Sequence, residues 1–62
     1  MKLYKFINMF DNWNIDTVVN DNELKVIVAG NTYAIMEKRR DLYNKEVVAF
    51  GFYDGQLTVR VK

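Results

Sequence analysis

Side chains able to do covalent or acid–base chemistry are few in this sequence. Histidine, cysteine and serine are all absent, so the usual general base and the usual nucleophiles are missing. The eight carboxylates are spread singly, and two of them, Asp21 and Asp54, are explained by turns. Neither a glycine-rich phosphate loop nor a metal-ligand spacing occurs. The sequence therefore predicts a protein that is not an enzyme and that carries no cofactor or metal.

The only concentrated charge is the basic run Lys38-Arg39-Arg40, with Lys45 close behind it. These four side chains could bind phosphate groups of a nucleic acid or a nucleotide second messenger, with a tyrosine stacking on a base. Three acidic residues within the same ten positions offset the run, and the net charge of the chain is only +1. A solvated connection is the favoured interpretation, and phosphate binding is the alternative.

Three aromatic residues, Trp13, Tyr43 and Tyr53, are the candidate contacts for a protein partner. Tryptophan is enriched among interface hot spots, although Trp13 could equally attach a helix to a sheet. The tyrosines fall off the predicted core face or at its edge. Such surplus apolar surface favours self-association, most simply a two-fold dimer joined through an edge strand or through a face containing Ile27 and Ala34.

The elements that must position these residues fit in one domain, residues 1–62. A chain of 62 residues that is half apolar is too hydrophobic for a disordered tail, and no apolar run reaches the length of a membrane span. No signal peptide is recognisable at the N-terminus. These observations predict a cytoplasmic protein with no membrane partner.

The first segment, Lys2–Phe10, is predicted to be a helix. Its apolar residues Leu3, Phe6, Ile7 and Phe10 recur at the spacing of one helix face. A helix of about nine residues is too short to be stable alone, so it must pack on the rest of the fold.

Three tight turns organise the predicted strands. A turn at Asp21-Asn22 places Val19 opposite Leu24 and Ile15 opposite Val28, and a turn at Gly30-Asn31 starts a strand containing Tyr33 and Ile35. The Asp54-Gly55 pair predicts a third hairpin, in which the facing pairs are Phe52 with Leu57, Phe50 with Val59, and Val48 with Val61.

The predicted fold is therefore α+β, a short N-terminal helix packed on a bent antiparallel sheet or small open barrel of four to five strands. Residues 37–45 are predicted to cross between the two halves of the sheet as one helical turn or an ordered loop. The expected core includes Leu24, Val26, Val48, Phe50 and Phe52, so Phe50→Ala is expected to cost about 3–5 kcal/mol and to unfold the protein.

Three segments, Met1–Ile7, Val28–Gly30 and Leu42–Val48, carry a resemblance. Together they resemble short uncharacterised proteins encoded by phages and prophages of Gram-positive bacteria, which often begin with a Lys-Leu-x-x-Phe helix and end with a valine-rich hairpin. The basic run at Lys38–Arg40 departs from those proteins, which are usually more acidic there. The order of elements is also similar to that of Sm-like small barrels, which form rings and bind RNA.

The resemblance implies an accessory phage role and supplies no catalytic residue. Together with the missing catalytic chemistry and the surplus aromatics, it predicts a non-catalytic protein that binds and inhibits a host or defence protein. The expected partners are thus a host protein and a second copy of the chain.

Overall fold

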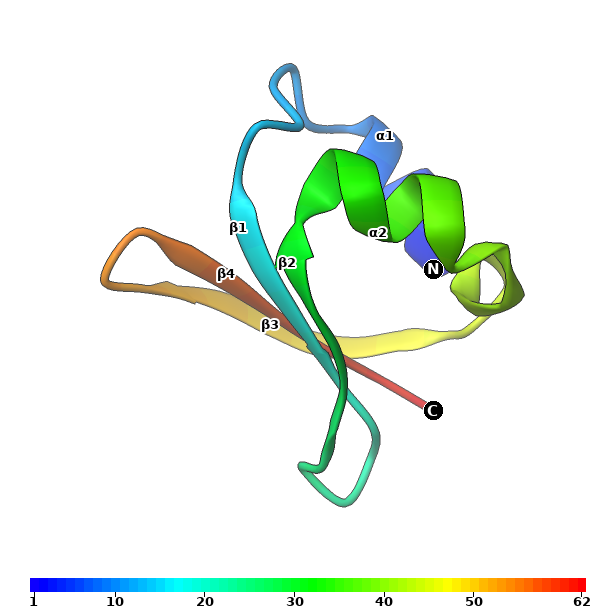
Figure 1. The fold of residues 1–62 in the computed structure, drawn as a ribbon. Coiled ribbons are helices and arrows are strands. Elements are labelled where there is room, and N and C mark those ends of the chain that lie inside the picture. Colours follow the sequence, from blue (N-terminus) through cyan, green and yellow to red (C-terminus); the bar gives the residue numbers. More distant parts are fainter.

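The computed structural model describes all 62 residues and shows two helices and a short 3₁₀ helix packed against four strands (Figure 1). In chain order the elements are α1 (Leu3–Asn8), β1 (Asp16–Asn20), β2 (Val26–Asn31), α2 (Thr32–Lys38), η1 (Arg40–Leu42), β3 (Val47–Tyr53) and β4 (Gln56–Val61). The predicted α+β class is confirmed, because the short N-terminal helix packs on a four-stranded sheet.

The sheet has the strand order β2-β1-β4-β3 and is mixed rather than wholly antiparallel. Two antiparallel hairpins, β1–β2 and β3–β4, meet where β1 and β4 run parallel, with Val19 opposite Val59. Parallel neighbours need a long connection, and the segment containing α2 and η1 is part of it. The consequence is that β2 and β3 are the two edge strands.

One face of this sheet carries both helices and the core (Figure 1). Ten buried apolar residues form a single cluster: Leu3, Phe6, Ile7, Val19, Ile35, Met36, Leu42, Leu57, Val59 and Val61. The predicted α1 stripe is confirmed, with its first three members buried and Phe10 half-buried. The first N–H groups of α1 are also satisfied, since Leu3 donates to the Lys45 carbonyl at 2.9 Å.

The predicted register of the first hairpin is wrong by four residues. Val19 lies opposite Val28, and β2 begins only at Val26. The carboxylate of Asp21 accepts the N–H groups of Glu23 and Lys25, which stabilises a loop wider than the two-residue turn. As a result Leu24, which has a φ of 67°, and Val26 are exposed and contribute nothing to the core.

The Gly30-Asn31 pair begins a helix instead of turning into another strand. The side chain of Asn31 accepts the N–H of Tyr33 at 3.0 Å and caps α2. The predicted strand over 32–36 is therefore wrong, and so is the predicted face formed by Ile27 and Ala34. Ile27 packs against the core, whereas Ala34 is exposed on α2. Residues 37–45 do contain a short helical turn, η1, which buries Leu42.

The second hairpin has the predicted pairs Phe52 with Leu57 and Phe50 with Val59, whereas Val47, not Val48, lies opposite Val61 after an irregularity in β3. Leu57 is completely buried, but Phe50 is 61% exposed and Phe52 is 55% exposed. Both rings are on the helix side of the sheet, yet β3 is its edge, beyond the cover that the two short helices provide. The prediction that Val48, Phe50 and Phe52 belong to the core is thus wrong.

Candidate functional site

Trp13 follows α1 and has a structural role. Its indole Nε1 donates to the carbonyl of Ile7 at 3.1 Å, and its ring is half-buried against the core. The ring centroid lies 5.6 Å from that of Tyr33, whose side chain is exposed. The bond to Ile7 fits the alternative in which the tryptophan attaches the helix to the sheet, and the exposed part of the aromatic pair is the Tyr33 ring.

Tyr43 is likewise tied into the fold. Its hydroxyl donates to the Met36 carbonyl, and its ring stacks on that of Tyr4 with centroids 4.7 Å apart. These contacts join the C-terminal part of α2, the segment after η1 and α1. The half-buried ring of Tyr43 therefore offers less free surface than its place in the sequence suggested.

Tyr53 is the most open of the three predicted contacts, with 68% of its surface exposed. It ends β3 on the outer face of the sheet, the face away from the helices. Its ring lies over Gly51, because a Cβ atom on that glycine would stand 3.1 Å from the Tyr53 hydroxyl oxygen. The glycine thus lets an aromatic ring lie flat on an uncovered sheet surface.

A shallow cavity of about 150 Å³ is lined by Tyr53 together with Leu24, Thr58 and Arg60. Arg60 is paired in register with Asn20 of β1, next to the buried pair Val19 and Val59, so both side chains belong to the outer face. The Nε of Arg60 and the Oδ1 of Asn20 are buried without a hydrogen-bond partner. We call Asn20, Leu24, Tyr53, Thr58 and Arg60 the outer-face site.

The outer-face site combines an exposed tyrosine, an exposed leucine and an arginine with unmet hydrogen-bonding capacity. Tyrosine and arginine are the residues enriched at the energetic centres of protein interfaces. The alternation of the Asp54-Gly55 hairpin already predicts that Arg60 and Tyr53 leave the core face. Sequence reasoning missed Leu24 and Asn20 at this site because the first hairpin has a different register.

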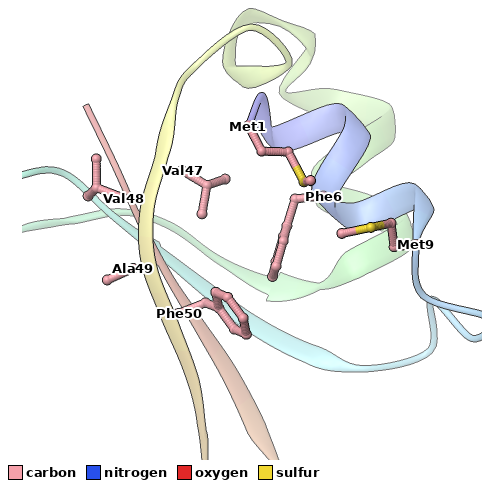
Figure 2. Close-up of a pocket in the computed structure, with 7 residues that line it drawn as sticks. All are labelled: Met1, Phe6, Met9, Val47, Val48, Ala49 and Phe50. Atoms are coloured by element: carbon pink, nitrogen blue, oxygen red, sulfur yellow. The ribbon is translucent and has the colours of Figure 1, made fainter.

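A second concave surface lies between α1 and β3. Its cavity of about 460 Å³ is lined only by apolar residues, Met1, Phe6 and Met9 on one side and residues 47–50 on the other. Figure 2 shows Val47 and Phe50 directed toward α1, whereas Val48 and Ala49 extend from the opposite side of the strand. We call this surface the α1–β3 groove.

Aromatic contacts form the floor of the α1–β3 groove and continue along β3. The ring of Phe6 lies 4.7 Å from that of Phe50, and Phe10 lies 6.2 Å from Phe52. Met9, beside them, is 63% exposed. A strip of apolar side chains therefore faces solvent beside the unpaired backbone of the edge strand.

The four basic candidates lie at the end of α2 and in the segment after it. Arg39 is not free, because its Nε and Nη2 atoms donate to the two carboxylate oxygens of Asp41 at 2.9 and 2.8 Å. This bidentate pair lowers the pKa of Asp41 and raises that of Arg39. Lys38, Arg40 and Lys45 are exposed and have no acidic partner within 4.0 Å.

Lys38 and Arg39 also border a cavity of about 260 Å³ between β2 and α2, where Gly30 and Ala34 leave room. Lys45 and Arg40 are not among the residues that line it. The structure thus brings two of the four predicted cations to one concavity, and one of those two is already paired.

No group of three or more carboxylates is placed to hold a metal ion, and none of the helices has the length and apolar composition needed to cross a membrane. Comparisons with protein-family models, with curated proteins and with solved structures find no match to this chain.

Proposed function

We propose that the protein is a non-catalytic binding protein, a phage accessory protein that acts in the cytoplasm of the host cell and blocks a host or defence protein. One observation carries the proposal: both helices cover the same face of the sheet (Figure 1), and on the outer face Tyr53 and Leu24 are exposed beside the half-buried Arg60. The phage origin is supported by the sequence resemblance alone.

The chemistry of the outer-face site defines the partner surface. Arg60 is the only charged residue of this site, so a matching surface presents a carboxylate to it. The unmet Arg60 Nε and Asn20 Oδ1 atoms each cost free energy in the free protein, and a partner's polar groups satisfy them once the Arg60 side chain turns outward. Tyr53 and Leu24 supply the apolar contact beside this polar centre.

The test uses the immobilised chain to isolate a target from a Gram-positive bacterial lysate, followed by calorimetric titration of the purified target. Tyr53→Ser and Arg60→Gln are each expected to weaken binding at least about tenfold, which corresponds to 1.4 kcal/mol. Tyr33→Ser is the matched control, because Tyr33 is an exposed tyrosine on α2, 58% against 68% for Tyr53, and belongs to no part of the outer-face site. Retention of no protein, or equal affinity of the Tyr53→Ser variant, contradicts the proposal.

A second candidate function, binding of nucleic acid or a nucleotide second messenger, is supported by the free cations Lys38, Arg40 and Lys45. The cavity beside Lys38 and Arg39 gives such a ligand a place to lie. The pairing of Arg39 with Asp41 weakens this function relative to the first, since a phosphate must displace a carboxylate already in place.

A further inference from the structure

The edge strand β3 lacks the features by which natural edge strands avoid pairing. Its sequence, Val-Val-Ala-Phe-Gly-Phe-Tyr, contains no charged residue and no proline, and its irregularity lies at the start, between Val47 and Ala49. Lysine, proline or a bulge in mid-strand would discourage another strand from adding to this edge. From Ala49 to Tyr53 the strand is regular and open.

The surface beside the β3 edge is as apolar as the interfaces of permanent dimers. Every residue lining the α1–β3 groove is apolar, and Phe52 extends the strip toward the turn. Interfaces between subunits of permanent dimers are more apolar than those of transient complexes. The outer-face site differs, since it includes an arginine and an asparagine.

We propose that a second copy of this chain occupies the β3 edge, pairing its own β3 antiparallel to the first across a two-fold axis. The two sheets then join into one sheet of eight strands, with α1 of each copy on the same side. The Phe and Met side chains beside the two edges come together and are removed from water.

The backbone limits which registers are available. In a hairpin with a two-residue loop, the residues that flank the loop, here Tyr53 and Gln56, form backbone hydrogen bonds with each other. Backbone groups alternate in direction along a strand, so the N–H and C=O groups of Phe52 and Phe50 point away from β4. A second β3 must therefore bond through the same two residues. Three registers meet this condition: Phe50 opposite Phe50, Phe50 opposite Phe52, and Phe52 opposite Phe52, the last of which places Phe50 opposite Asp54, beyond the end of β3.

The covered start of β3 decides between the registers. Lys2 bridges Glu46, and the N–H of Val47 donates to the Met1 carbonyl at 2.8 Å, so the open edge begins after Val47. With Phe50 opposite itself, Tyr53 of each copy faces this covered Val47, and Phe52 faces the irregular part of β3. With Phe50 opposite Phe52 of the second copy, Gly51 lies on the two-fold axis, all five regular residues from Ala49 to Tyr53 pair, and the aromatic rings pair twice.

The size of the surface is compatible with a stable dimer. A standard interface buries about 800 Å² on each partner, roughly a fifth of the 4185 Å² that this chain exposes. Met1, Met9, Phe50 and Phe52 are each more than half exposed, and with the strand edge they form one apolar region from which such an area can be drawn. The other edge, β2, has two small residues, Ala29 and Gly30, before its last residue Asn31, and offers less apolar surface.

Sedimentation of the full chain at 50 µM tests the proposal. The wild type is expected to sediment at twice the 7.4 kDa mass of one chain, and Phe52→Lys is expected to dissociate into single copies with at least a tenfold higher dissociation constant. Val26→Lys, at a 63% exposed position on the opposite edge, is the control and is expected to remain a dimer. A 7.4 kDa wild-type species, or a dimer lost in Val26→Lys and kept in Phe52→Lys, overturns the proposal.

A cross-linking variant tests the register. The natural chain has no cysteine, so Ala49→Cys/Tyr53→Cys contains only the two introduced thiols. In the proposed register residue 49 of one copy lies opposite residue 53 of the other, within disulfide reach, whereas residues 49 and 53 of one strand are too far apart to join. Oxidation is expected to give a covalent dimer. A covalent dimer from Val26→Cys and none from the double variant excludes pairing at β3.

Discussion

The hydroxyl oxygens of Thr17 in β1 and Thr32 in α2 lie 2.7 Å apart in the buried interior. Both hydroxyls can donate to the Ile15 carbonyl, Thr32 at 2.9 Å and Thr17 at 3.4 Å, and the shorter distance favours Thr32 as that donor and Thr17 as the donor to Thr32. This chain of bonds holds the first turn of α2 against the central strand. It also satisfies the only two polar residues that the core buries.

Thr32→Val is expected to destabilise the fold by about 1–3 kcal/mol, because the buried Thr17 hydroxyl loses its 2.7 Å partner and keeps only the longer contact to the Ile15 carbonyl, at 3.4 Å. The double variant Thr17→Val/Thr32→Val removes both polar groups and is expected to recover most of that loss. Urea unfolding of the wild type, both single variants and the double variant measures the coupling. Purely additive losses would show that the two hydroxyls do not interact.

Leu57→Ala is expected to cost about 2–5 kcal/mol, since Leu57 is wholly buried. Phe50→Ala removes an exposed ring whose main partner is Phe6, so its expected cost is about 0.5–1.5 kcal/mol. The midpoints of urea unfolding compare the stability loss of the two variants, and they are measured at a protein concentration at which both variants sediment as single copies. A larger loss in Phe50→Ala than in Leu57→Ala would place Phe50 in the core after all.

Asn31→Ala is expected to destabilise the protein by about 1 kcal/mol through loss of the α2 cap. Its amide also donates to Asn14 at 2.8 Å, and that contact is lost as well. Asn31→Asp keeps the capping acceptor and is expected to retain most of the stability, while Asn22→Ala, in the exposed first-hairpin loop, serves as the control. Thermal unfolding, followed by circular dichroism, provides the comparison. Equal unfolding midpoints for Asn31→Ala and Asn22→Ala would show that the Asn31 cap does not stabilise α2.

Acid stability depends on Glu46, whose carboxylate accepts a hydrogen bond from the N-terminal ammonium group of Met1. This bond and the ammonium charge lower the pKa of Glu46 below its ordinary value of 4.5. A lowered pKa in the folded state contributes stability above pH 4.5, and that contribution is lost as pH falls through the folded value. Glu46→Gln is therefore expected to flatten the fall in urea midpoint between pH 6 and pH 3, whereas the exposed control Glu37→Gln is expected to follow the wild type.

Local patterns predict the parts of this fold that local chemistry determines. The stripe Leu3, Phe6 and Ile7 and the Asp54-Gly55 turn can be recognised from neighbouring residues alone, and both are present as expected. The sequence over α2 satisfies two patterns at once, since Tyr33 and Ile35 alternate like a strand while Ile35 and Met36 extend a helical stripe. The Thr17 contact and the β1–β4 pairing favour the helix, and both are distant in sequence.

The candidate sites were less predictable for a related reason. The alternation of side chains along β3 places Phe50 and Phe52 on the helix side of the sheet. Whether they are buried depends on how much of that face the two helices cover, and no local sequence pattern determines this area. Tyr53 is exposed because its side chain lies on the outer face of the sheet, which neither helix covers. Trp13 acquires its structural role from one bond to the Ile7 carbonyl.

Phosphate binding, the second candidate function, makes a distinct prediction for Arg39 and Arg40. Labelled RNA, DNA and cyclic dinucleotides, each tested at 50 and 150 mM salt, are the probes. If the exposed cations hold phosphate, Arg40→Ala weakens retention and reduces the log–log salt slope by about 0.7–0.9, the contribution of one contact. Arg39→Ala is expected to do less, because Asp41 already holds its guanidinium. We expect no retention of these probes at 150 mM salt, because we favour protein binding through the outer-face site over phosphate binding. Retention that is abolished by Arg40→Ala would make phosphate binding the favoured function.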